Sequence, residues 1–383
     1  MKIKPSTMTS RIALAGLALA VVGGSAAIGA DDTMPPGRSI AYAANDIKLS
    51  VYQTKDAKDE CPHGVNTLGP REQFKLLYPQ DAGQKWKFVD TQMGREAEIW
   101  WPTLDKAEEF PFIEAEGKTA IGLDLDGKTK PSDFTSPEGK SGVDNQLYRV
   151  VGCIMNYRDG ASIINSERAF LLGYHFNRLL IELTDVDSLV NDDDVTITTY
   201  RGLDALLRDA QGDFQAGGTE RIDMRWGGKD FVHTGKGMIV NGVLKSEPMD
   251  ILVPQQVAFS SAAASTLRGA RFDLKLTPAK AEGLIGGYAD IESFYRRFNR
   301  AWGTHFMSYG QQVPPMVYRA LHHLADGYPD PETGDNTAIS SSYSVKLVQV
   351  RILHAGKEVA ETDSQRDARQ LAESGTSSPS DAK

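Results

Sequence analysis

The sequence predicts a mainly β fold, a β-sandwich or jelly roll of the lectin or laminin-G type with two or three short helices. Three observations indicate this class. Short runs of alternating or β-branched residues recur along the chain, glycines and acidic turn residues separate them, and the clear helical patterns come late. The alternation of strand and helix patterns that a parallel α/β sheet requires is not evident.

The length and composition are those of a globular protein with a substantial core. The chain has 383 residues, and 40% of them are hydrophobic, which is enough for one large or two ordinary domains. We expect a signal peptide at residues 1–30, a flexible leader at 31–45, a single β-rich domain at 46–353 and a disordered polar tail at 354–383.

The first thirty residues have the layout of a secretory signal. Three basic residues precede an apolar run at 12–22, and small residues continue through Ala30. An uncleaved membrane anchor is the alternative, but the run is short and Gly23 and Gly24 interrupt it. We therefore expect export to the periplasm or the cell exterior, with no transmembrane anchoring after cleavage. The cleavage point stays open.

The charge balance disfavours nucleic acid as a partner. The formal charge is -9, and removal of residues 1–30 takes away three positive charges and no acids, which gives -12. An acidic protein repels a phosphate backbone. We expect no nucleic-acid partner.

The expected elements are spread over the whole domain. Strands are predicted at 46–52, 178–183, 195–200, 251–259, 270–276 and 339–353, and helices at 166–173, 290–303 and 314–325. The apolar phase of the last strand changes near Leu347, which predicts a bulge there. Three of the five tryptophans lie at 86–101, either in the core or as a stacking platform.

Two cysteines, Cys61 and Cys153, are present. In an exported protein one disulfide is the simplest pairing, and two buried free thiols are the alternative. Sequence spacing does not show whether the two side chains meet.

The most patterned stretch runs from residue 121 to 154 and gathers carboxylates at turns. Its acidic and amide side chains supply the hard oxygen ligands that calcium prefers, and the candidate ligands are Asp124, Asp126, Asp133, Asp144 and Asn145. The spacing is not that of an EF-hand, because Lys128 stands where a third ligand belongs. The alternative is that these residues only form turns and solvated surface. Further acidic clusters lie at 192–194 and 330–336.

The segment 122–129 satisfies the phosphate-loop pattern G-x-x-x-x-G-K-[ST]. We interpret the match as chance, since Asp124 and Asp126 would repel a phosphate and Pro131 prevents the helix that should follow. We expect no nucleotide cofactor.

Other residues have weaker signals. His322 and Asp326 lie one helical turn apart, as metal ligands do, but a third ligand is missing and exposed histidines explain them equally well. Acid pairs such as Glu114 with Glu116, or Asp290 with Glu292, have the residue type of glycosidase carboxylates. With 51 acids in the chain such pairs are common.

Two resemblances remain. The turn Gly303-Thr304-His305-Phe306, after an aromatic helix, resembles the signature of perforin-like pore formers; the glycine pair that should follow is absent, and we interpret the similarity as coincidental.

A second resemblance spans nearly the whole mature region. Its segments are CPHGVN at 61–66, PREQF at 70–74, DLDG at 124–127, DFTSPEG at 133–139, GVDNQLYRVVGC at 142–153, NDDD at 191–194, ADGYPDP at 325–331 and AIS at 338–340. Together these segments resemble a family of exported bacterial proteins without an assigned function. The resemblance implies export and a β-rich body, and it implies that Cys153 pairs with Cys61 or stays reduced.

These observations favour an exported, non-catalytic binding module, stabilised by calcium, for a carbohydrate or another component of the cell envelope. The alternative is a secreted hydrolase that acts on polysaccharide with a carboxylate pair beside the tryptophans near Ile99. A pore former or envelope structural protein is a third class. Whether there is any catalysis stays open.

Overall fold

The structure is a computed structural model. It describes residues 33–66, 113–174, 177–258, 261–300 and 314–354. The expected signal peptide, the tail from residue 355 on, the tryptophan-rich stretch at 86–101 and the turn at 303–306 lie outside the described residues.

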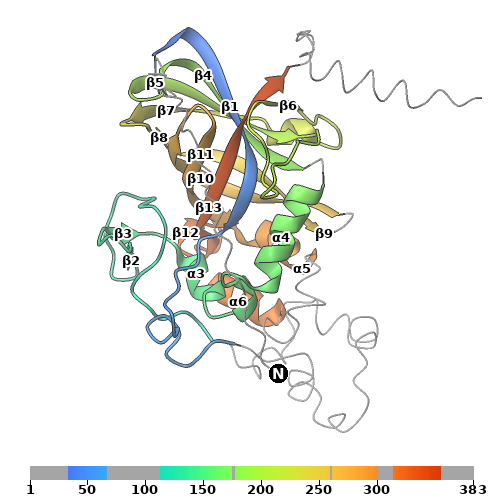
Figure 1. Cartoon of the computed structure of the whole chain (residues 1–383). Coiled ribbons are helices and arrows are strands. Elements are labelled where there is room, and N and C mark those ends of the chain that lie inside the picture. The colour runs from blue at the N-terminus through green and yellow to red at the C-terminus, as the bar shows by residue number, and fades with distance from the viewer. Residues whose placement is uncertain (1–32, 67–112, 175–176, 259–260, 301–313, 355–383) are drawn as a thin grey trace, which may run out of the picture. The chain divides into compact units, whose positions relative to one another are not determined.

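The described chain is mainly β, as predicted, with a few short helices (Figure 1). The strands are β1 (Thr33–Leu49), β2 (Phe134–Thr135), β3 (Ser141–Val143), β4 (Arg178–Ser188), β5 (Asp192–Gly202), β6 (Gly218–Arg221), β7 (His233–Val240), β8 (Val243–Ser246), β9 (Met249–Ala258), β10 (Ser261–Leu276), β11 (Lys280–Asp290), β12 (Gly327–Pro329) and β13 (Asn336–Leu353). The helices are α3 (Gln146–Val151), α4 (Ser162–Gly173), α5 (Ile291–Arg300) and α6 (Pro314–His323), with short 3-10 turns η4 (Met155–Tyr157) and η5 (Gly228–Phe231).

The main sheet closes on itself. Within the described residues its strands follow the order β1-β4-β5-β7-β8-β10-β11-β13, each antiparallel to the next, and β13 pairs again with β1. Eight strands therefore form a closed antiparallel barrel, with β6, β9 and β12 attached to it. The expected sandwich of two sheets is wrong, because β1 and β13 hydrogen-bond to each other along Ala41–Leu49 and leave no gap in the ring.

The segment expected to be a flexible leader is instead part of the barrel. Residues from Thr33 on belong to β1, which pairs with β4 on one side and with β13 on the other. Ala43, for example, lies opposite Leu180 and opposite Val348. The prolines that suggested a leader lie at the start of this strand, where few ladder bonds are lost.

The helices cover one end of the barrel and share its core (Figure 1). Phe294 and Phe298 of α5 and Leu321 of α6 are buried in the same apolar cluster as Tyr343 of β13. This confirms the amphipathic patterns that predicted the two late helices. In the described part of the chain, no helix combines the length and the apolar character needed to cross a membrane.

A second apolar cluster explains the change of phase in the last strand. Val348 and Val350 of β13 pack with Leu206 and Phe214 of the loop before β6, whereas Leu347 belongs to the larger core. The predicted bulge near Leu347 is therefore not in β13. The register shifts on the partner strand β1, between Ala44 and Asp46.

The disulfide is present between Cys61 and Cys153, with 5.8 Å between their Cα atoms. It ties the loop after β1 to the turn after α3, and both cysteines are buried. Beside it Arg158 donates a hydrogen bond of 2.5 Å to Glu60, which is also buried. The Glu116 N–H donates to the Glu60 carbonyl at 2.9 Å, which links the segment before the acidic loops to this ion pair.

Candidate metal centre

The acidic stretch folds as two short segments held side by side. Leu123 and Asp144 form an isolated antiparallel bridge, and the Asp144 backbone N–H donates to the Leu123 carbonyl at 2.9 Å. Gly127, with φ of +72°, lets the first segment turn sharply, and its N–H donates to Asp124 at 2.7 Å. Side chains that are twenty residues apart in sequence therefore face each other.

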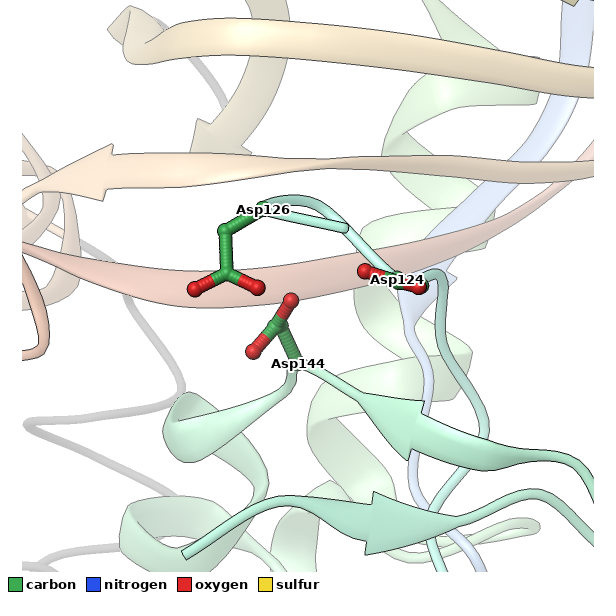
Figure 2. A group of neighbouring side chains, drawn as sticks. All are labelled: Asp124, Asp126 and Asp144. Carbon is green, nitrogen blue, oxygen red and sulfur yellow. The ribbon is translucent and has the colours of Figure 1, made fainter. Parts of the chain in front are cut away.

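The structure brings together three of the predicted ligands. One carboxylate oxygen each of Asp124, Asp126 and Asp144 lies within 4.8 Å of the others. Figure 2 shows the carboxylates of Asp126 and Asp144 turned toward one another, with Asp124 to one side. Calcium binds oxygen at about 2.3–2.6 Å, so two oxygens of one calcium shell are at most about 4.6–5.2 Å apart. The three carboxylates can therefore hold one metal ion.

Asp144 has an unusual environment for a carboxylate. Its side chain is 1% exposed. Oδ2 accepts a hydrogen bond of 2.7 Å from the Leu125 N–H, whereas Oδ1 is buried with no hydrogen-bond partner among the described residues. Burial, and then the charges of Asp126 and Asp133, raise the pKa of Asp144 to about 6. A buried carboxyl of this kind is either protonated or paired with a cation.

A lysine from the same loop supplies part of that positive charge. The Lys130 ammonium pairs with Asp126, and this contact lowers the pKa of Asp126 and raises that of Lys130. The pair is partly exposed to solvent, so its net stabilisation is small. Lys130 therefore neutralises Asp126 and leaves Oδ1 of Asp144 without a hydrogen-bond partner among the described residues.

The cluster rests against the outside of the barrel. A methyl group added to Gly286 of β11 would meet Leu123 and Leu125 at 3.1–3.3 Å, so the acidic loop packs directly on this strand. Arg271 also donates to the Leu125 carbonyl at 3.3 Å. Two strands of the barrel thus determine where Asp124 and Asp126 lie.

Asp326, which the sequence suggests as a partner of His322, lies instead near this centre. The Ser340 backbone N–H donates to Asp326 at 2.6 Å, and the Ser340 hydroxyl accepts from the N–H of Gln146, two residues after Asp144. Burial raises the pKa of Asp326. The hydrogen bonds from Ser340 and the charge of Lys130 partly offset this rise. The sequence places Asp326 beside His322 on a helix, and no pattern indicates its proximity to residues 124–144.

The other two predicted ligands have structural partners. The Asn145 amide caps helix α3 through its oxygen and donates to the carbonyls of Ser50 and Ile121. Asp133 accepts from the Lys130 backbone N–H at 2.5 Å. The group of three facing carboxylates does not include these two side chains. Their roles as calcium ligands stay predictions.

The remaining acidic motifs form turns or other contacts. Asp192 accepts from the N–H groups of Asp187 and Asp194, and Asp330 accepts from those of Glu332 and Thr333. His322 and Asp326 do not converge: His322 lies beside the Tyr318 ring and 3.8 Å from Glu292, whereas Asp326 binds Ser340. The tryptophans near Ile99, beside which an acid pair was expected, lie outside the described residues.

Comparison with known proteins finds no relative of this chain. The chain matches no protein-family model, no curated protein and no solved structure.

Proposed function

We propose that this protein is an exported, non-catalytic binding module whose fold is stabilised by a calcium ion held by Asp124, Asp126 and Asp144. One observation carries the proposal. The carboxylate of Asp144 is almost fully buried, its Oδ1 has no hydrogen-bond partner among the described residues, and one of its oxygens lies within 4.8 Å of oxygens of two further carboxylates. Oxygen ligands of this kind suit calcium, and the layout of the first thirty residues supports export.

Calcium is favoured over magnesium by the donor set. Three carboxylates converge here from two loops, and calcium accepts such irregular shells of six to eight oxygens. Magnesium demands octahedral geometry and usually takes only one or two carboxylates with several waters. Sites in extracellular modules bind calcium with dissociation constants of about 10⁻⁴–10⁻³ M, which suits an exported protein.

The test is a calcium titration of the full mature chain by calorimetry, together with thermal melts in calcium and in chelator. We expect saturable binding and a higher melting temperature in calcium, because a ligand that binds only the folded state stabilises it by about 2.7 kcal/mol at one hundred times its dissociation constant. Asp144→Asn should abolish both effects. Asp187→Asn, at an exposed acid near the end of β4, is the matched control. An unchanged melting temperature and no heat of binding in the wild type would refute the proposal.

A further inference from the structure

A second concave site lies beside the barrel, formed by elements distant in sequence. A cavity of about 550 Å³ is bounded by Arg268 of β10, the end of β11, the start of α5, the end of α6, and β12 with its following turn. Its lining includes Asp290, Glu292, His322 and Tyr328. Small-molecule sites in proteins usually measure about 300–1,000 Å³. Every lining residue named here lies in the described part of the chain.

One wall of this cavity is an aromatic ring in a fixed position. Tyr328 is 40% exposed, although one aromatic and one cationic side chain contact its ring. The Tyr288 ring lies edge-on at 5.5 Å between centroids, and the Arg268 guanidinium lies 5.2 Å from the ring centroid. Its φ of +55° is a conformation that residues with a Cβ rarely adopt, and such strain persists only where surrounding contacts maintain it. The contacts with Tyr288 and Arg268 therefore hold the ring in this position.

Hydrogen-bonding groups line the same cavity, and contacts with their neighbours already orient them. Arg268 donates to Asp290 at 2.5 Å and to Thr337 at 3.1 Å. Glu292 accepts from the Tyr318 hydroxyl at 2.6 Å. A carboxylate has about four lone-pair positions, so these bonds leave capacity for a ligand. The site thus combines a flat apolar surface with prepositioned donors and acceptors.

The charges of the lining restrict the ligand. Asp290, Glu292 and Asp330 carry three negative charges against one positive charge on Arg268, which disfavours an anion. The carboxylates attract a cation, but the Arg268 guanidinium, which already lies against the ring, disfavours one at the ring itself. A neutral, polyhydroxylated ligand meets neither penalty, since its hydroxyl groups both donate and accept and its C–H faces pack on an aromatic ring.

We infer that this cavity is a binding site for a neutral saccharide, with Tyr328 as the stacking surface and Glu292 and Arg268 as hydrogen-bonding partners of the sugar hydroxyls. The inference rests on the proposed function in that it names the ligand class of the binding module. The residues of the cavity and of the metal centre are different sets, so the two proposals fail separately.

The test uses the full mature chain at a fixed calcium concentration. Neutral tetrasaccharides, namely cellotetraose, maltotetraose, laminaritetraose, mannotetraose and chitotetraose, are screened by saturation-transfer NMR and calorimetry, with choline, spermidine and citrate as charged probes. We expect at least one tetrasaccharide to bind and the charged probes not to bind. Binding of none of the five, or of charged probes only, would overturn the inference.

Variants locate the site. Tyr328→Ala should weaken binding of that tetrasaccharide by roughly tenfold or more, and Glu292→Gln should weaken it by a smaller factor. Glu292→Gln keeps the test informative if Tyr328→Ala does not fold. Trp226→Ala removes a ring that is 81% exposed and lies outside the cavity, and it should leave the affinity unchanged. Loss of binding in Trp226→Ala, or unchanged binding in both cavity variants, would place the site elsewhere. The calcium-dependent melting shift should persist in both cavity variants. Its absence from the wild type would instead refute the metal centre.

Discussion

The hydroxyl of Tyr328 lies directly over Gly269 of β10: a methyl group added to Gly269 would stand 2.8 Å from this oxygen. Gly269 also has a φ of +56°, in the left-handed region that favours glycine. The position of the Tyr328 ring in the proposed saccharide site therefore depends on the absence of a side chain at Gly269 of β10.

We predict that Gly269→Ala weakens tetrasaccharide binding by roughly tenfold, because the added methyl group displaces Tyr328. It should also cost about 1–2 kcal/mol of stability from the backbone conformation. Calorimetry and denaturant unfolding measure the two effects. Gly212→Ala is the control, since Gly212 has φ of +87° and nothing within 4 Å of an added Cβ. It should lose stability but keep affinity; equal affinity in both variants would contradict the role of Tyr328.

The buried carboxyl of Asp144 predicts a pH dependence of stability. Its pKa is raised to about 6, so in chelator the folded state binds a proton more tightly than the unfolded state does. The stability contribution of this group is therefore present below about pH 4 and is lost as the pH rises to about 6. We expect Asp144→Asn to be more stable than the wild type at pH 7 in chelator, by an amount on the order of 1–3 kcal/mol.

This prediction reverses in calcium. A bound cation stabilises the charged form of Asp144, so the wild type should then exceed Asp144→Asn in stability. Denaturant unfolding from pH 4 to 8, with and without calcium, measures both differences. An identical pH dependence of the two proteins in chelator would show that Asp144 is not a buried charge.

Lys130 is expected to compete with the cation. Because its ammonium pairs with Asp126, Lys130→Met should tighten calcium binding by roughly three- to tenfold. Lys140→Met, a change of the same type at an exposed position of the following turn, should have little effect. Calorimetric titration compares the two variants. Equal dissociation constants would indicate that Lys130 lies away from the bound ion.

Removal of the disulfide should destabilise the protein without removing the barrel. Cys61 and Cys153 are 92 residues apart, and opening a loop of this size costs about 2–5 kcal/mol. We expect this loss for the double variant Cys61→Ser and Cys153→Ser, measured by denaturant unfolding, with the β-type circular dichroism signal retained in the absence of denaturant. Reducing agent should lower the stability of the wild type but not that of the double variant.

Much of the secondary structure was predictable because it depends on local periodicity. The helix that contains Phe294 and Phe298 and the strand that contains Val195 and Ile197 lie where their patterns predict them. The stretch before Asp46 was mistaken for a leader, since its prolines and small residues show no alternation, and only pairing with β4 and β13 makes it a strand.

The candidate metal centre was partly predictable for a similar reason. Asp124, Asp126 and Asp144 lie in one stretch of chain whose turn residues bring the two segments together. The proximity of Asp326 to this centre and the cavity lined by Tyr328 were not predictable, because both depend on contacts between segments far apart in sequence.

The sequence by itself determined several of the strands and the two late helices, that carboxylates gather at turns between 121 and 145, and that two cysteines are available to pair. These follow from side-chain periodicity and turn chemistry, which act over a few residues. The tertiary structure alone decided that the sheet closes between β1 and β13, that Asp144 is buried with an unpartnered oxygen among the described residues, and that Arg268, Glu292 and Tyr328 line one cavity. Strand partners and burial result from packing of the whole chain, and no local pattern specifies them.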